Sequence, residues 1–384
     1  MKNKPLTSAG LAALALLLGV ASPARAQSAP ADPAATPETK RLLANLYKLL
    51  DKGVMFGHQD DLAYGLTPEG QRWLAGAPTA AAGRSDVKSV TGAYPAVFGW
   101  ELGHVELDSA RSLDAVPFAR IRQYVRQVYE LGGVNTISWH LDNPHDGKSA
   151  WDTTRTVRYI LPGGPDHARY VQYLDRLASF LGSLKGAKGE AIPVIFRPFH
   201  EHTGSWFWWG EKNCTVAEYK QLWQFTATYL REKKQLHNLL LAYSAAEARD
   251  QAHYLERYPG DAYVDVVGFD AYYSGDGSAF KKQMETELPI ITAVARAHHK
   301  LPTLSETGFE RLPAADWWTK TLLPTLAGYK LSYALVWRNG RPDHYYAPYP
   351  GQASAADFKK FAQDKQVLLS DKVTPLRLYQ GVVK

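Results

Sequence analysis

The chain has 384 residues, of which 45% are hydrophobic, and a formal net charge of +6 at pH 7. This length and composition are ample for one large hydrophobic core. Lysine and arginine form no dense run, so we expect no nucleic-acid partner. The single cysteine, Cys214, cannot form an internal disulfide, and we expect it to be a structural residue.

The first 26 residues have the pattern of a secretory signal peptide. A basic start with two lysines precedes an apolar run at residues 11–20, and a small-x-small cleavage signal ends at Ala26. The apolar run is too short to anchor the chain in a membrane, and no later segment approaches the required length. We therefore expect cleavage after Ala26 and a secreted or periplasmic protein without membrane association. Cleavage removes three basic residues and no acidic one, which lowers the net charge to +3.

Residues 27–37 are rich in alanine and proline, which predicts a flexible lead-in. Thr36, Pro37 and Glu38 then provide a helix cap, a first-turn proline and an acidic first turn. Leucines at helical spacing continue this helix to about Asp51. We expect residues 38–384 to form one catalytic domain.

Eight short β-rich runs follow, and amphipathic helical patterns separate several of them. Apolar strands that alternate with helices indicate a parallel sheet covered by helices. Eight such units predict an α/β protein with a single (β/α)8 TIM barrel. A doubly wound sheet is the alternative, but no glycine-rich phosphate loop follows an early strand. The runs are Val54–His58, Ala96–Glu101, Val134–His140, Ile192–Arg197, Leu239–Tyr243, Val264–Asp270, Thr303–Glu306 and Tyr333–Trp337.

Nearly all of these runs end in polar or aromatic residues that can carry chemistry. Active sites of (β/α)8 barrels lie at the carboxyl ends of the strands, where the following loops converge. The fourth run is the most informative, because Glu201 follows it directly and stands between two histidines and ahead of four aromatic residues at positions 206–209. A carboxylate among aromatic rings loses hydration, which raises its pKa and favours a general acid.

A second carboxylate, Glu306, closes the seventh run. The ends of the fourth and seventh strands lie nearly opposite each other across the mouth of a barrel. Glycoside hydrolysis needs such a pair: one carboxylic acid protonates the leaving oxygen, and the other group attacks the anomeric carbon or activates water. The two glutamates together therefore predict a glycoside hydrolase.

Several motifs resemble those of glycoside hydrolase family 26, the β-mannanases, in the same order along the chain. The sequence RPFHE at residues 197–201, followed by GSWFWWG, is similar to the acid/base motif of that family, and SETG at residues 305–308 is similar to its nucleophile motif. GHQ at 57–59, SWH at 138–140, VDVVGFD at 264–270 and VWRN at 336–339 also match. The resemblance spans about residues 40–370.

The resemblance implies a retaining enzyme that cleaves β-1,4-mannosidic bonds in mannan, glucomannan or galactomannan. Glu201 would be the proton donor and Glu306 the nucleophile, as in the clan whose catalytic glutamates end barrel strands 4 and 7. Tyr272 would hydrogen-bond the nucleophile. The other substrate-binding residues implied by the resemblance are His140, Trp151, His200, Trp206, Trp337 and Arg338.

Four alternatives stay open at this point. The same fold and mechanism would also serve β-1,3-xylan, mixed-linkage β-glucan or exo-acting release of mannobiose. A non-catalytic glycan-binding protein is a more distant alternative, since both carboxylates are present. We expect no metal and no cofactor, because no H-x-H ends the first run and no HExxH motif lies on a helix. The expected partner is a β-mannan polysaccharide or manno-oligosaccharide, bound by a monomer.

Overall fold

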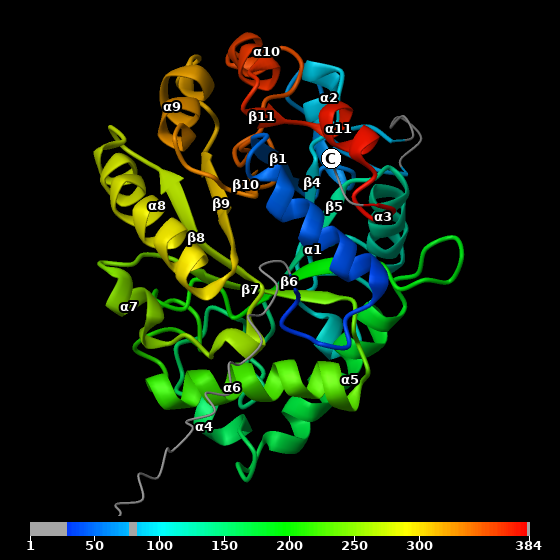
Figure 1. Cartoon of the computed structure of the whole chain (residues 1–384), viewed down its shortest axis with the longest axis vertical. Helices are drawn as coiled ribbons and strands as arrows, with labels where there is room; N and C mark the ends of the chain where they lie inside the picture. Colours follow the sequence, from blue (N-terminus) through cyan, green and yellow to red (C-terminus); the bar gives the residue numbers. More distant parts are fainter. Residues whose placement is uncertain (1–28, 77–82, 382–384) are drawn as a thin grey trace, which may run out of the picture.

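The computed structural model describes residues 29–76 and 83–381, so the predicted signal peptide lies outside the described residues. Eight parallel strands form a closed barrel, because β10 pairs back with β1. The helices lie outside this ring of strands (Figure 1). The expected (β/α)8 barrel is therefore confirmed. Its strands are β1 (Val54–Gln59), β4 (Val97–Glu101), β5 (Val134–Trp139), β6 (Val194–Pro198), β7 (Leu239–Ala245), β8 (Val266–Tyr273), β9 (Leu301–Phe309) and β10 (Tyr333–Val336).

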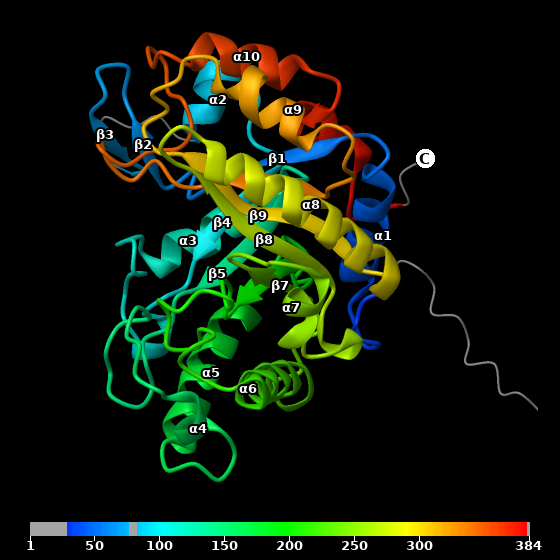
Figure 2. The same cartoon turned by 90° about the vertical axis from the view of Figure 1, so that its left-hand side faces the viewer.

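The helices bury their apolar stripes against the outside of the barrel, and α8 with α9 covers the β8–β9 side (Figure 2). In the described part of the chain, no helix is long and apolar enough to cross a membrane. The α-helices are α1 (Pro37–Leu49), α2 (Asp86–Thr91), α3 (Phe118–Glu130), α4 (Val157–Ile160), α5 (His167–Gly182), α6 (Val216–Thr228), α7 (Gln251–Glu256), α8 (Ser278–His298), α9 (Leu323–Leu326), α10 (Ala355–Gln363) and α11 (Ser370–Val373), with π-helical turns at Tyr229–Lys233 and Trp318–Leu322.

Helix α1 packs against the N-terminal end of the barrel, away from the strand ends that carry the polar residues. Its buried leucines share one hydrophobic cluster with Met55, Ile195 and Leu301, which come from strands β1, β6 and β9. This end of the barrel is therefore filled by apolar side chains, and the chemistry is left to the opposite end.

The segment before α1 differs from the flexible lead-in that its composition predicts. From residue 29 onward it lies against the barrel: the amide of Ala31 donates to the carboxylate of Asp265 at 2.5 Å, and Asp32 pairs with His237 at 2.8 Å. Ala31 and Asp32 are both buried. The polar partners precede strands β7 and β8, more than 200 residues away, so local composition could not reveal them.

The long connection between β1 and β4 contains a small antiparallel hairpin that the sequence did not predict. Strand β2 (Tyr64–Leu66) pairs with β3 (Arg72–Leu74). The buried carboxylate of Asp86 accepts hydrogen bonds from the indole of Trp73 at 2.7 Å, the amide of Leu66 at 2.8 Å and the side chain of Asn339 at 2.8 Å. Asp86 thereby ties the hairpin to the loop after β10, beside the mouth of the barrel.

Strand β9 contains a β-bulge at the position of its carboxylate. Phe269 of β8 pairs with Leu304, but the next residue, Asp270, pairs with Glu306, so Ser305 is an extra residue in β9. The pairing of β10 with β9 shifts at the same place. Bulges next to active sites re-aim side chains, and this one places Glu306 beside Asp270.

Candidate active site

Glu201 lies on a strained turn that begins as soon as β6 ends. Both Phe199 and Glu201 have positive backbone φ angles, 47° and 52°, in the left-handed region that non-glycine residues rarely adopt. The amide of Glu201 donates to the carbonyl of Ser244 on β7 at 2.9 Å. The surrounding structure therefore holds this side chain in a direction that a regular strand or helix would not give it.

The side chain of Glu201 is partly exposed and accepts a hydrogen bond from the indole N–H of Trp206 at 2.7 Å. Loss of hydration and the negative charge of Glu306 raise the pKa of Glu201 to about 7, although Trp206 and Arg197 act in the opposite direction. A carboxyl group with this pKa is partly protonated near neutral pH and can donate a proton.

Glu306 has the opposite environment. The guanidinium of Arg197 donates to one carboxylate oxygen of Glu306 and also binds Asp270 at 2.9 Å. The hydroxyl of Tyr272 donates to the other oxygen of Glu306 at 2.6 Å. A cation and a hydroxyl donor stabilise the ionised carboxylate and fix its direction, which suits a nucleophile.

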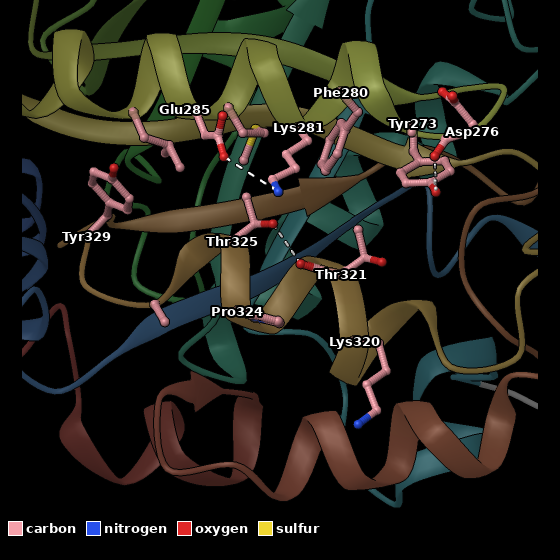
Figure 3. Close-up of a pocket in the computed structure, with 14 residues that line it drawn as sticks. Tyr273, Asp276, Phe280, Lys281, Glu285, Lys320, Thr321, Pro324, Thr325 and Tyr329 are labelled. Atoms are coloured by element: carbon pink, nitrogen blue, oxygen red, sulfur yellow. Dashed lines mark hydrogen bonds and ion pairs between the residues drawn. The ribbon is translucent and has the colours of Figure 1, made fainter.

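The adjacent tyrosines Tyr272 and Tyr273 point to opposite sides of β8, as successive strand residues do. Tyr273 lines a groove of about 490 Å³ between α8 and α9, on the outside of the barrel, together with Phe280 (Figure 3). Tyr272 therefore belongs to the candidate site, and Tyr273 belongs to the packing between barrel and helices.

Oxygen atoms of Glu201, Asp270 and Glu306 lie within 4.8 Å of one another. In glycosidases that retain configuration, the two carboxyl groups are roughly 5–5.5 Å apart, whereas inverting enzymes need roughly 6.5–9.5 Å to hold a water molecule between them. The short separation of Glu201 and Glu306 suits direct attack by a carboxylate.

Two histidines and a buried glutamate form a chain beside the carboxylate pair. Oε2 of Glu101 lies 2.7 Å from Nδ1 of His140, and Nε2 of His140 lies 3.0 Å from Nε2 of His200. Burial raises the pKa of Glu101, but the charge and hydrogen bonds of His140 outweigh it and lower the pKa to about 2. Burial lowers the pKa of His140, but Glu101 outweighs it and raises the pKa overall.

Burial and the charge of Arg197 lower the pKa of His200, so this imidazole is neutral. The facing Nε2 atoms of His140 and His200 share one hydrogen bond, so one ring donates and the other accepts. Sequence reasoning noted Glu101 at a strand end but gave it no role. Its position at the carboxyl end of a barrel strand was the available signal.

Three of the expected substrate-binding tryptophans lie around this centre. Trp151 is 49% exposed and stacks on His140 with ring centroids 5.1 Å apart. Trp206 is 43% exposed. The ring of Trp337 lies 6.4 Å from that of His140. Exposed aromatic faces beside a carboxylate pair can cover the apolar CH faces of sugars.

The neighbouring aromatics Phe207, Trp208 and Trp209 are buried and pack the interior of the loop. Arg338 lies in a separate group at the edge of the site, where its guanidinium pairs with Asp114 at 3.0 Å and approaches the hydroxyl of Tyr64 at 3.4 Å. Neither of these two partners was singled out from the sequence.

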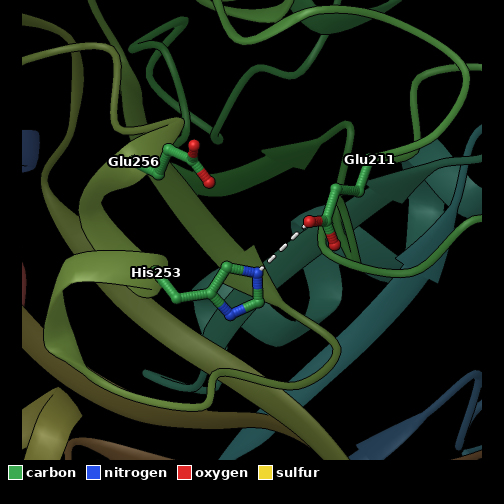
Figure 4. A group of neighbouring side chains, drawn as sticks. All are labelled: Glu211, His253 and Glu256. Atoms are coloured by element: carbon green, nitrogen blue, oxygen red, sulfur yellow. Dashed lines mark ion pairs between the residues drawn. The ribbon is translucent and has the colours of Figure 1, made fainter.

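Among residues 29–76 and 83–381, two groups of side chains have the composition of a metal site. Glu211, His253 and Glu256 form the first (Figure 4). The amide of Arg249 donates to Nδ1 of His253 at 3.3 Å, so the proton resides on Nε2, which faces Glu211 at 3.6 Å. A metal-bound imidazole instead offers a lone pair at that atom and donates from the other nitrogen.

The second group is the carboxylate cluster of Glu201, Asp270 and Glu306 itself. There the guanidinium of Arg197 already supplies the positive charge. In each group, a hydrogen-bond donor of the chain itself, His253 or Arg197, already faces a carboxylate.

A family model described as Glycosyl hydrolase family 26 matches residues 31–318. A mannan endo-1,4-β-mannosidase from Bifidobacterium adolescentis is 34% identical over an alignment of 319 residues that covers 77% of this chain and 32% of that protein. A mannan endo-1,4-β-mannosidase from Bacillus subtilis is 31% identical over 69% of this chain and 72% of its own length. The chain thus spans about a third of the length of the Bifidobacterium protein.

Solved structures agree with these relatives. A family 26 β-mannanase from Bacteroides ovatus superimposes with a TM-score of 0.85 at 46% identity and covers 90% of this chain and 98% of its own. A double mutant of an endo-β-1,4-mannanase from Cellulomonas fimi superimposes with a TM-score of 0.81 at 34% identity, over 92% of this chain and 80% of its own. The chain belongs to glycoside hydrolase family 26.

Proposed function

We propose that this protein is a mannan endo-1,4-β-mannosidase that retains anomeric configuration. The observation that carries the proposal is the pair of unlike carboxyl groups within 4.8 Å: Glu201 with a raised pKa, and Glu306 bound to Arg197 and Tyr272. The mannanase names of its relatives support the substrate class. A non-catalytic glycan-binding protein would need neither group.

In the proposed first step, the carboxylate of Glu306 attacks the anomeric carbon while Glu201 transfers its proton to the departing glycosidic oxygen. This breaks the glycosidic bond and forms a glycosyl ester on Glu306. In the second step, the ionised Glu201 removes a proton from water, which attacks the same carbon and releases Glu306. Arg197 and Tyr272 hold the nucleophile in line throughout both steps.

The proposed substrate contacts follow from exposure and position. Trp151 and Trp206 are half-exposed and both contact the ring of Phe207, and the ring of Trp337 lies edge-on to His140. His140, whose ring stacks on Trp151, is proposed to lie along the bound sugar, and His200 is proposed to position it through the contact between their Nε2 atoms. Arg338 is proposed to bind substrate farther from the cleaved bond.

We further propose that residues 1–26 direct export and that residues 38–384 act as one monomeric catalytic domain. Export would place the enzyme where polymeric mannan occurs, because a polysaccharide does not cross a membrane unaided. N-terminal sequencing of the mature protein would test this, with a start at Gln27 expected and a retained Met1 contradicting it.

A time course on mannohexaose tests the main proposal. We expect products of mixed length at early times and a first product of β configuration by proton NMR. Early release of mannobiose alone would instead support the exo-acting alternative. Faster hydrolysis of β-1,3-xylan or mixed-linkage β-glucan than of mannan, in a panel of pure glycans, would overturn the substrate assignment.

A further inference from the structure

Arg257 is a buried arginine that follows α7 and contacts the loop carrying Glu201 at three separate places. Its guanidinium donates to the carbonyl of His202 at 2.5 Å, to the carbonyl of Trp209 at 3.3 Å and to Sγ of Cys214 at 2.7 Å. The residue is only 2% exposed. One side chain thus joins the beginning, middle and end of the connection between β6 and α6.

This cation is buried without an acidic counterpart. In the part of the chain that the structure describes, no carboxylate forms an ion pair with Arg257, and the guanidinium instead lies 4.2 Å from the ring centroid of Tyr219. Burial of a charge without a carboxylate is costly, and an apolar side chain would fill the same space without that cost. The planar fork of donors is what an apolar residue cannot supply.

The segment that Arg257 holds is the strained turn at residues 199–202. The hydroxyl of Tyr219 donates to the carbonyl of Phe199 at 2.9 Å, and the ring of the same tyrosine faces Arg257. Both ends of the turn are therefore tied to the guanidinium: Phe199 through Tyr219, and His202 directly. Glu201 lies between these two anchors with its φ of 52°.

We propose that Arg257 is a positioning residue that holds Glu201 in the orientation required for proton donation. The inference rests on the proposed function, because it concerns the acid of that reaction. Arg257 does not touch the carboxylate and acts through the backbone of the loop. A shift of about 1 Å in a catalytic group can cost about 10²-fold in rate.

The substitution Arg257→Lys tests this, because an ammonium group cannot reach three acceptors in one plane. We compare kcat/KM for mannohexaose with kcat/KM for a dinitrophenyl β-mannobioside, whose leaving group departs without a proton. The value of kcat/KM reports only the first, bond-breaking step for both substrates. We expect a loss of about 10²-fold for mannohexaose and of less than about threefold for the aryl glycoside.

Arg231→Lys is the matched control. Arg231 is also a buried arginine, but it binds the carbonyl of Ala262 and the carboxylate of Asp265, away from the Glu201 loop. We expect this variant to lower thermal stability and to leave the ratio of the two kcat/KM values unchanged. If Arg257→Lys lowers both values equally, as a structural defect would, the proposal is overturned.

A second variant applies if Arg257→Lys does not fold. Tyr219→Phe keeps the ring under the guanidinium and removes only the hydrogen bond to Phe199, so we expect the same unequal loss on a smaller scale. An unchanged ratio in a folded Tyr219→Phe would contradict the proposal. Failure of the proposed function would give a different result, because the unmodified protein would then hydrolyse neither substrate.

Discussion

The indole N–H of Trp206 donates to Oε2 of Glu201 at 2.7 Å, so the most exposed aromatic of the loop is bonded directly to its carboxyl group. This bond favours the ionised form of Glu201, in opposition to burial and the charge of Glu306. A sugar that stacks on Trp206 therefore lies against a ring that also sets the proton affinity of the acid. In the proposed mechanism, sugar binding and proton transfer would both depend on Trp206.

The substitution Trp206→Phe removes the hydrogen bond and keeps an aromatic face. Loss of a donor to the ionised carboxylate raises the pKa of Glu201 above its value of about 7. The first step needs the protonated form, so activity falls as the pH rises through this pKa. We expect the alkaline limb of kcat/KM for mannohexaose to move to higher pH, and kcat/KM at its optimum to fall up to about tenfold from lost ring contact.

Trp317→Phe is the control for that measurement. Trp317 is buried, away from the carboxylates, and its indole nitrogen has no hydrogen-bond partner within the described residues. The alkaline limb of this variant should coincide with that of the unmodified enzyme. If the alkaline limb of the pH profile does not move in Trp206→Phe either, the hydrogen bond does not set the pKa of Glu201.

Tyr272→Phe removes the hydroxyl donor from the carboxylate of Glu306. Loss of one preorganised donor at a reacting oxygen typically costs about 10²-fold or more in rate. We expect a decrease of roughly 10–10²-fold in kcat/KM for both mannohexaose and a dinitrophenyl mannobioside, because nucleophilic attack precedes cleavage in each.

Tyr273→Phe is the control, because it removes a hydroxyl group from the adjacent residue without removing a hydrogen bond to Glu306. Among the residues that the structure describes, the hydroxyl of Tyr273 donates to the carbonyl of Asp276 alone, on the outside of the barrel. Its kcat/KM should stay within about twofold of the unmodified enzyme, as for other surface changes. Equal losses for the two tyrosine variants would remove Tyr272 from the proposed site.

Substitution of each carboxylate by alanine distinguishes the two proposed roles. Glu201→Ala lacks the proton donor, so we expect loss of about 10³-fold or more on mannohexaose but a formation rate of the glycosyl intermediate on dinitrophenyl mannobioside that is largely kept. Glu306→Ala lacks the nucleophile and should be inactive on both substrates. Full activity of Glu201→Ala on unactivated mannan would refute the assignment of the acid.

The eight barrel strands could be predicted because most of them are short apolar runs, and the carboxylates because Glu306 ends such a run and Glu201 lies a few residues after one. The direction of Glu306 could not be predicted, since the bulge at Ser305 depends on the register of β9 against β8 and β10. A local sequence pattern does not determine that register. The sequence therefore predicted the glutamate but not its contact with Arg197.

Long-range hydrogen bonds account for the other differences. Glu101 bonds to His140, which is 39 residues later, and Arg257 bonds to His202, which is 55 residues earlier. Neither spacing corresponds to a helix or strand period, so periodicity gives no signal for it. The first contact arises because a barrel brings the ends of separate strands to one face, and the second because α7 follows β7, which is the neighbour of β6.

The last prediction concerns stability and uses Glu287, a buried glutamate of α8 outside the candidate site. One carboxyl oxygen accepts from the amide of Ala248 at 2.6 Å, and the other has no partner among the described residues. Burial raises the pKa of Glu287 from 4.5 to about 8. A carboxyl group whose pKa is raised on folding contributes full stability below its unfolded pKa, and this contribution is lost as the pH rises through the folded pKa.

The stability of the unmodified protein should therefore decrease between about pH 4.5 and pH 8 through this group, by at most about 5 kcal/mol. Glu287→Gln cannot ionise and keeps an oxygen for the amide of Ala248. We expect urea unfolding at pH 9 to show a more stable variant than the unmodified protein, with the difference vanishing near pH 4. Glu285→Gln, on an exposed position of the same helix, should show no such pH dependence. A Glu287→Gln variant that is less stable at pH 9 would mean that the carboxylate is ionised and satisfied in the folded protein.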